Sequence, residues 1–395
     1  MTATDHVLNL FEEAFGSAHG ARLLAVHAPA RSEIAGNHTD HEGGHVIAGA
    51  LDAAISGVAA ANGCREIRVS SEGYPDFCVC VDDLAQHVDE RVSPAALVRG
   101  MAQAMRETGR SPQGLDLVLA STIPNGGGLS SSAAMEAALG RAMEALWEGV
   151  ALKPQTLARM GQRAENDYFG KPCGLMDQLA VCLGGLAFMD FEIANEPRSA
   201  KLDLDFERHG YALMLIDVGC DHSRFTQDYA AVPDEMQKVA ANFGKKRLCE
   251  VDPADFDARA MRLREELGDR AVLRAIHYWR ENELVDERWD ALRRGDMDAF
   301  LDLTRESGAS SAMFLQNVSS GDRYQPAMLA LGLAERVLSG RGATRIHGGG
   351  FGGSIQAFVP LDLTDEFSRR MDAWLGAGSC RRYVIAAQGA SATWL

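Results

Sequence analysis

A run of three glycines followed by three serines constrains this chain more than any other feature. The run P-N-G-G-G-L-S-S-S-A-A-M-E spans 124–136 and leads into a helical pattern whose apolar side is Met135, Leu139, Met143 and Leu146. Unpaired N–H groups and the positive end of the helix dipole meet where such a helix begins, which predicts an anion site. The serine hydroxyls add donors and oxygen ligands for Mg²⁺. The other interpretation is a flexible turn capped by serine. A Walker loop is excluded, because no lysine follows the glycines.

The remaining pattern mixes strands and helices and predicts an α+β fold in two lobes. Strand patterns are expected at 66–70, 77–81, 115–120, 212–218, 343–346, 354–359 and 382–387. Ser93 followed by Pro94 predicts the start of a helix, and 233–338 is almost entirely helical in pattern. A polar stretch at 193–201 is the best candidate boundary. We therefore expect an N-terminal lobe over 1–198 and a C-terminal lobe over 199–395.

Charge and composition exclude several classes of function. The 395 residues carry 55 acidic against 39 basic side chains, a formal net charge of −16, which disfavours nucleic-acid and membrane-surface binding. The longest apolar stretch, 46–61, is too short to span a bilayer, and the first fifteen residues do not resemble a signal peptide. Among eight cysteines, Cys78 and Cys80 lie in a strand pattern and are expected to be buried thiols. We expect a soluble, cytoplasmic protein in a reducing compartment.

A second glycine-rich segment, A-T-R-I-H-G-G-G-F-G-G-S, spans 343–354. Gly348, Gly350 and Gly353 formally satisfy a dinucleotide fingerprint, but a strand pattern rather than a helix follows them. The sequence therefore predicts a strand, a glycine loop and a strand, a loop that permits close packing beside a phosphate or an active-site segment.

Two polar segments supply candidate chemistry. The stretch 28–44 gathers Arg31, His38, Asp40 and His41 among glycines, and so many hydrogen-bonding groups suit a sugar. The stretch 164–178 contains two carboxylates, those of Glu165 and Asp177. One of the two carboxylates could hold Mg²⁺ while the other accepts a proton from a hydroxyl nucleophile. A solvated surface loop and two solvated acids are the alternatives for these segments taken singly.

Together, the four segments resemble the motifs of the GHMP small-molecule kinase superfamily, and within it the chain is most similar to the galactokinase family. The run R-S-E-I-A-G-N-H-T-D-H resembles the signature R-x-N-L-I-G-E-H-T-D-Y, and C-G-L-M-D-Q resembles the stretch that bears the catalytic aspartate. The resemblance covers nearly the whole chain. It implies an N-terminal lobe like ribosomal protein S5, a ferredoxin-like C-terminal lobe, and an active site between them.

The resemblance also implies roles for individual residues. Asp177 corresponds to the base or electrostatic partner of the sugar 1-hydroxyl, and Arg31 to the group that stabilises the transferred phosphoryl charge. The positions that match sugar contacts are Asn37, His38, Asp40, Gly174 and Tyr229. Those that match the ATP phosphate loop are Gly126, Gly127, Gly128, Leu129, Ser130, Ser131 and Ser132. Ser132 and Glu165 correspond to Mg²⁺ ligands, with Ser130 and Ser131 as alternatives to Ser132.

The expected function is therefore ATP-dependent phosphorylation of the 1-hydroxyl of galactose, with ATP, Mg²⁺ and a sugar as small-molecule partners and the oligomeric state left open. Two departures from the galactokinase wording bear on the sugar: Asn37 replaces a glutamate that resembles a clamp for the 6-hydroxyl, and His41 replaces a tyrosine. The sequence A-A-V-P after Tyr229 and S-G-A-S at 307–310 also differ from the family pattern. A related sugar such as galacturonic acid, or a non-catalytic sugar sensor, are the alternative interpretations.

Overall fold

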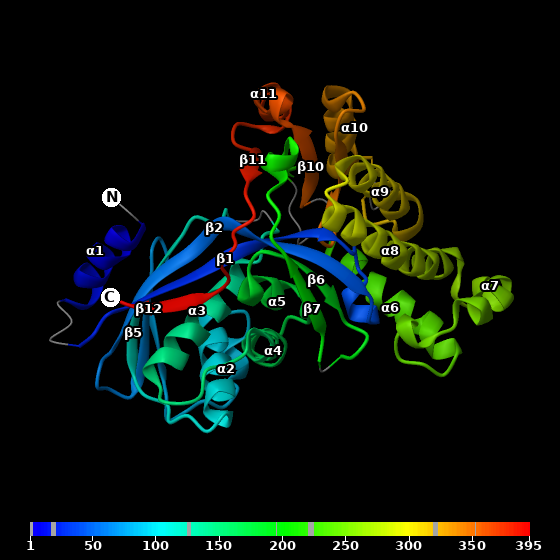
Figure 1. The fold of residues 1–395 in the computed structure, drawn as a ribbon. Helices are drawn as coiled ribbons and strands as arrows, with labels where there is room; N and C mark the ends of the chain where they lie inside the picture. Colours follow the sequence, from blue (N-terminus) through cyan, green and yellow to red (C-terminus); the bar gives the residue numbers. More distant parts are fainter. Residues whose placement is uncertain are drawn as a thin grey trace.

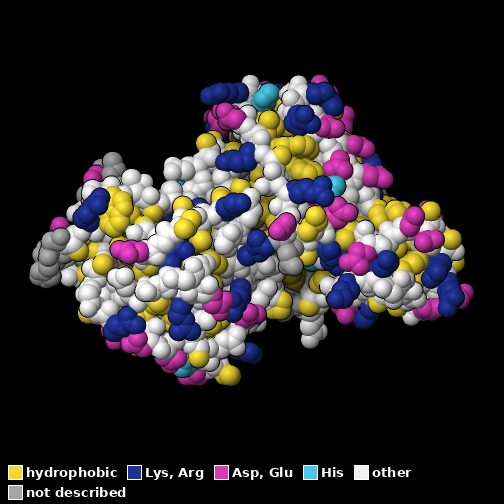
Figure 2. Space-filling model, turned by 60° about the horizontal axis from the view of Figure 1, so that its bottom comes forward, with side chains coloured by type: hydrophobic (Ala, Val, Ile, Leu, Met, Phe, Trp, Pro, Cys, Tyr) yellow, Lys and Arg dark blue, Asp and Glu magenta, His cyan; other side chains and the backbone are white. Residues whose placement is uncertain are grey.

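The computed structural model describes residues 3–16, 21–124, 128–194, 196–219, 225–318, 323–351 and 353–395. They form two β-sheets with helices packed on them, the mixed α+β architecture predicted from the sequence (Figure 1). On the face drawn in Figure 2, basic and acidic side chains are interspersed, and neither sign forms one continuous patch. None of the helices in the described ranges is long and apolar enough to cross a membrane.

The larger sheet has eight strands, ordered β12-β1-β2-β5-β3-β4, with β6 paired to β2 and β7 to β6. Its strands are β1 (Leu24–Ala35), β2 (His45–Ala61), β3 (Glu66–Ser71), β4 (Phe77–Cys80), β5 (Leu115–Ser121), β6 (Leu186–Asp190), β7 (Arg198–Leu202) and β12 (Ser391–Trp394). One face is covered by α2 (Pro94–Glu107), α3 (Ser131–Leu146), α4 (Pro154–Arg163) and α5 (Met176–Leu183), whose apolar side chains share one core with the strands. Helix α1 (Ala3–Phe15) packs on β2 and β5 through a separate cluster.

The smaller sheet is antiparallel and ordered β11-β8-β10-β9. Its strands are β8 (Tyr211–Asp217), β9 (Ala343–His347), β10 (Ser354–Pro360) and β11 (Cys380–Tyr383). Side chains of β8 alternate between two cores, because Met214 and Ile216 pack under α10 (Pro326–Leu338) and α11 (Thr364–Leu375), whereas Leu213 and Leu215 join the larger core. Helices α6 (Thr226–Asn242), α7 (Pro253–Leu267), α8 (Asp269–Arg294) and α9 (Met297–Ser310) extend from this sheet along one side of the molecule (Figure 1).

Several local predictions are confirmed. Ser93 caps α2 by accepting a hydrogen bond from the Ala96 backbone N–H, with proline at the first helical position. The strand patterns at 66–70, 115–120 and 354–359 are strands within a residue or two, and the 343–354 segment is the predicted strand, loop and strand. Helix α3 begins at Ser131, directly after the glycine-serine run.

Two predictions are wrong. Cys78 and Cys80 are exposed, because β4 is an edge strand that turns Val79 into the core and both thiols toward solvent. The strand expected over 382–387 stops at Tyr383, because Ala386 then donates to the Ala50 carbonyl of the larger sheet instead of continuing β11. The division of the chain at 198/199 stays a prediction; β7 straddles it, and the C-terminal strand β12 pairs with β1.

Candidate active site

The centre of the site is an ion pair between the second half of β1 and the start of α5. The Arg31 Nε and Nη2 atoms donate to the two carboxylate oxygens of Asp177 over 2.7 and 2.6 Å, a bidentate arrangement. Burial alone would raise the pKa of Asp177, but the Arg31 charge and hydrogen bonds from Arg31 and Ser130 outweigh it and hold that pKa below its ordinary value. Asp177 is therefore an anion that still reaches solvent, whereas the Arg31 side chain is buried.

Two hydroxyls of the serine triplet have different partners. Ser130, which precedes α3 with a left-handed φ of 56°, accepts a hydrogen bond from Arg31 Nη2 over 2.8 Å and donates to Asp177. Ser132 lies in the first turn of α3, and its hydroxyl donates to Glu165 over 3.2 Å. Arg31 also donates to the Gly128 carbonyl, which ties the phosphate-loop motif to the ion pair. Leu129 is buried and Ser131 is exposed at the start of α3, while Gly126 and Gly127 lie outside the described residues.

A second cluster of carboxylates lies beside Ser132. Gln178 donates to both Glu136 and Glu165, over 3.2 and 2.9 Å, and Lys171 donates to Glu165 over 3.1 Å. Burial, and after it the negative charge of Glu165, raises the pKa of Glu136 well above its ordinary value. One carboxyl oxygen of Glu136 has no hydrogen-bond partner. Two carboxylates and a serine hydroxyl form an oxygen donor set of the kind that Mg²⁺ prefers, so the residues present fit that ion.

Glu136 and Lys171 were not predicted from the sequence. Glu136 had a usable signal, because it follows Ser132 by four residues on a helix and so lies on the same face. Lys171 had none, since its approach to Glu165 depends on a turn of π-helix at Ala164–Phe169.

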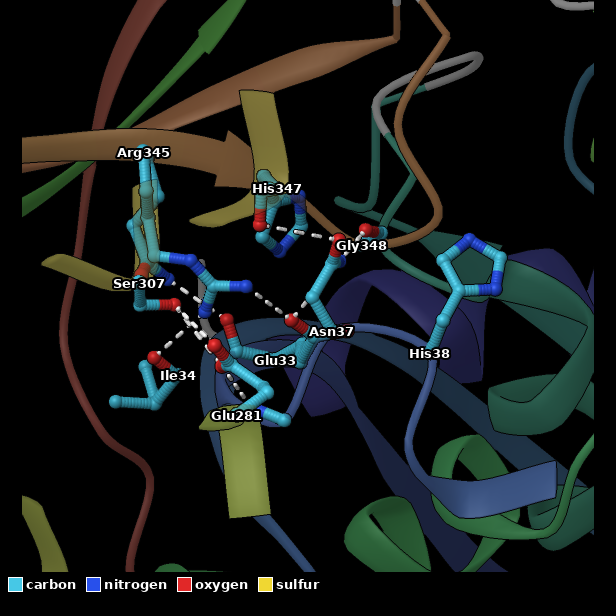
Figure 3. A network of polar contacts seen from close by, with 12 residues as sticks. Glu33, Ile34, Asn37, His38, Glu281, Ser307, Arg345, His347 and Gly348 are labelled. Carbon is cyan, nitrogen blue, oxygen red and sulfur yellow. Dashed lines mark hydrogen bonds and ion pairs between the residues drawn. The ribbon is translucent and has the colours of Figure 1, made fainter. Parts of the chain in front are cut away.

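The predicted sugar contacts His38, Asp40, Gly174 and Tyr229 gather next to the ion pair. The His38 and Tyr229 rings lie 5.2 Å apart between centroids, and Tyr229 remains half exposed. A Cβ at Gly174 would lie 1.9 Å from an Asp40 carboxylate oxygen, so any larger residue there would displace that carboxylate. Asn37, the fifth predicted contact, is fully buried, and its side-chain amide bonds to Glu33 and to the Gly348 carbonyl (Figure 3).

Three histidines around the site are buried and neutral. Burial lowers the pKa of His38 and of His347 to about 3, and it lowers the pKa of His277 as well. Each ring has two partners: His347 lies between the hydroxyls of Ser32 and Ser354, at 3.1 and 2.9 Å. Protonation would place an additional buried charge at any of them.

We expect these histidines to make stability depend on pH. Their pKa values are lower in the folded than in the unfolded chain, so the stability they provide is complete above about pH 6.5 and is lost as the pH falls toward 3. Between pH 7.5 and 5.5, His38 and His347 should each remove about 1 kcal/mol from the free energy of unfolding. His45, whose pKa is raised by its hydrogen bond to Asp286, opposes this change.

Urea unfolding at the two pH values measures the effect. His347→Gln should lose about 1 kcal/mol of the pH dependence. Equal pH dependence in wild type and His347→Gln would contradict a neutral buried His347.

Comparison with known proteins identifies the family. Residues 96–185 match the family described as GHMP kinases N terminal domain, and residues 9–61 match the galactokinase galactose-binding signature. A galactokinase of Mannheimia succiniciproducens is 31% identical over 379 residues, covering 93% of this chain and 92% of the relative. A galactokinase of Streptomyces coelicolor is 34% identical over 373 residues, covering 93% and 92%.

Solved structures show the same fold. The crystal structure of Lactococcus lactis galactokinase complexed with galactose superposes with a TM-score of 0.82 at 24% identity, covering 100% of both chains. A mevalonate kinase superposes with a TM-score of 0.61 at 15% identity, covering 92% of this chain and 99% of that one. The chain therefore belongs to the galactokinase family of the GHMP kinases, and it is a galactokinase-type phosphotransferase with an alcohol group as acceptor.

Proposed function

We propose that this protein transfers the γ-phosphoryl group of ATP to the anomeric 1-hydroxyl of galactose and releases galactose 1-phosphate and ADP. The observation that carries the proposal is the bidentate pair of Arg31 and Asp177, held by Ser130 at the start of α3 and flanked by His38 and Tyr229. The pair joins an ionised carboxylate to a guanidinium beside the phosphate-loop motif. The 31–34% identity to curated galactokinases supports galactose as the sugar.

In this mechanism the chain mainly positions the reactants and neutralises charge, as phosphoryl transfer requires. The Asp177 carboxylate accepts the proton of the 1-hydroxyl while the sugar oxygen forms a bond to the γ-phosphorus. The bond from that phosphorus to the bridging oxygen breaks, and ADP leaves with the electron pair. Arg31 stabilises the charge on the transferred group, and the free N–H groups at the start of α3 bind phosphate oxygens.

Ser132 and Glu165 would hold Mg²⁺, which when bound neutralises phosphate charge. Glu136 and Glu165 share the Gln178 amide as a donor, and Lys171 holds one of the Glu165 oxygens in place. Ser130 is a poorer candidate than Ser132 for this role, since its hydroxyl is already engaged by Arg31 and Asp177.

We expect Ser132→Ala to raise the Mg²⁺ concentration needed for half-maximal activity by about tenfold, the scale seen when groups around a metal are altered. The measurement is a Mg²⁺ titration of ADP release at saturating ATP and sugar. Ser131→Ala is the matched control, because Ser131 is the neighbouring hydroxyl and points to solvent. A shift with Ser131→Ala and none with Ser132→Ala would move the ligand to Ser131.

ADP release from Mg-ATP with a panel of sugars tests the function itself. Galactose, galacturonate, N-acetylgalactosamine, talose, glucose and arabinose form the panel, and ³¹P NMR of the product identifies the phosphorylated oxygen. Selective turnover of galactose with phosphate on the 1-position is the expected result, and an Asp177→Asn preparation controls for contaminating kinases. Turnover of galacturonate alone would contradict the proposed sugar and assign specificity to the loop that carries Asn37 and His41.

A further inference from the structure

Asn37 is enclosed by protein on both ends of its side-chain amide (Figure 3). Its Nδ2 donates to the Gly348 carbonyl and, over 3.4 Å, to Glu33 Oε1. Its Oδ1 accepts from Asn317 Nδ2 and, over 3.5 Å, from the Ser311 hydroxyl. A primary amide has two donor hydrogens and two acceptor lone pairs, so all four positions of this amide are occupied. A ligand that bound this amide would have to displace one of these protein groups.

The contacts of Asn37 fix the glycine loop between β9 and β10. Asn317, which donates to Asn37, binds the next residues of the same loop: its amide donates to the Gly349 carbonyl over 3.3 Å, and its backbone carbonyl accepts from the Phe351 N–H over 2.6 Å. A Cβ at Gly350 would lie 2.2 Å from that carbonyl, so the loop is packed tightly against Asn317. Asn37 and Asn317 thus form one hydrogen-bonded unit that holds segment 348–351.

That segment supports the sugar-side residues. The Gly349 carbonyl accepts a hydrogen bond from His38 Nε2 over 2.9 Å. A Cβ at Gly349 would lie 2.0 Å from the Tyr229 ring, so the ring packs directly on the loop backbone. A displacement of the loop would therefore move both His38 and Tyr229.

The charges around Asn37 explain why this position is neutral. Two buried ion pairs lie beside it: Arg345 donates to Glu33 over 2.7 Å, and Arg288 donates to Glu281 over 2.6 Å. The pairs balance, with two carboxylates and two guanidinium groups. A carboxylate in place of Asn37 would face Glu33 Oε1 and the Gly348 carbonyl, both acceptors, and would add an uncompensated buried charge. The protein groups around Asn37 therefore favour an amide at this position by themselves, independently of any ligand.

We propose that Asn37 is a positioning residue, which holds segment 348–351 against His38 and Tyr229 and makes no contact with the 6-position of the sugar. This replaces the expectation that Asn37 binds the sugar directly, and it rests on the proposed function for the choice of acceptor. Asn37 then acts on catalysis through the loop, equally for every acceptor that uses His38 and Tyr229.

The test compares galactose with 6-deoxygalactose, which lacks the 6-hydroxyl. With Asn37→Ala, kcat/KM should fall by about tenfold or more for both sugars, because a small misplacement of positioning groups is costly. The ratio of the two kcat/KM values should stay within about twofold of wild type, since the lost interaction is not with the substituent. A ratio that falls by fivefold or more, with galactose affected and 6-deoxygalactose spared, would show a direct contact and overturn the proposal.

Asn317→Ala is the matched variant, because Asn317 binds the same loop and Asn37 itself. It should lower kcat/KM for both sugars by the same factor, and the double variant should be no worse than the poorer single one. Additive losses would overturn the shared role. If Asn37→Ala does not fold, Asn317→Ala carries the comparison of the two sugars alone: a changed ratio contradicts the positioning role of the loop and an unchanged ratio supports it.

Wild-type kinetics separate this inference from the proposed function. Absence of galactose turnover by the wild type would refute galactose as acceptor, and the ratio would then be taken between the acceptor found in the sugar panel and its 6-deoxy form.

Discussion

Asp177→Asn is expected to lower kcat by about 10²–10⁴-fold, the range that a positioned general base contributes. The amide cannot accept the proton of the sugar hydroxyl, and it leaves the buried Arg31 without its anionic partner. Binding of nucleotide should persist, because the start of α3 and the Ser132–Glu165 pair are unchanged. ADP release measures the loss of turnover, and equilibrium titration with a fluorescent ATP analogue measures the retained binding.

Asp116→Asn is the matched control. Asp116 forms an equivalent bidentate pair with Arg68, over 2.6 and 2.7 Å, on β5 and β3 of the larger sheet, outside the candidate active site. This substitution should lower stability and leave kcat within about twofold of wild type. Near-normal turnover by Asp177→Asn would contradict its assignment as proton acceptor.

Glu281→Gln should lower the free energy of unfolding by about 3–5 kcal/mol, the cost of removing one partner from a buried ion pair. The side chains of Glu281 and Arg288 are both completely buried and 2.6 Å apart. Burial by itself would raise the pKa of Glu281, but Arg288 and Arg345 outweigh it and lower that pKa to about 2. The Ser307 hydroxyl also donates to Glu281, and the amide would accept it less strongly. Urea unfolding at pH 7.5 measures the change.

Glu283→Gln provides the comparison, because Glu283 lies on the same helix and pairs with Arg280 over 2.9 Å at an exposed position. Its loss should cost at most about 0.5 kcal/mol, as is usual for surface pairs. Equal effects of the two substitutions would show that burial does not decide the contribution of Glu281.

The sequence alone determined the local features of this protein. Ser93 before Pro94 specified a helix start, and the glycine-serine run specified a loop that ends in α3, because caps and glycine loops act within a few neighbouring residues. The motifs around Arg31 and Asp177 that resemble those of the family also identified the two residues that form the central ion pair. The sequence pattern did not predict the long strands β1 and β2. Both are rich in alanine and buried on both faces, so their apolar residues do not alternate with a period of two.

Only the tertiary structure decided which groups meet. Arg31 and Asp177 are 146 residues apart, and Asn37 reaches Asn317 across 280 residues, so no spacing rule connects them. The serine triplet reads as three equal hydroxyls, yet the left-handed turn at Ser130 directs it to Asp177 while α3 directs Ser132 to Glu165. Asn37 stands in the sequence among residues expected to bind the sugar, but packing places its amide in a buried network beside two ion pairs. The physical reason is common to all three cases: local sequence sets the backbone path, whereas the partners of a side chain depend on burial and charge contributed by distant segments.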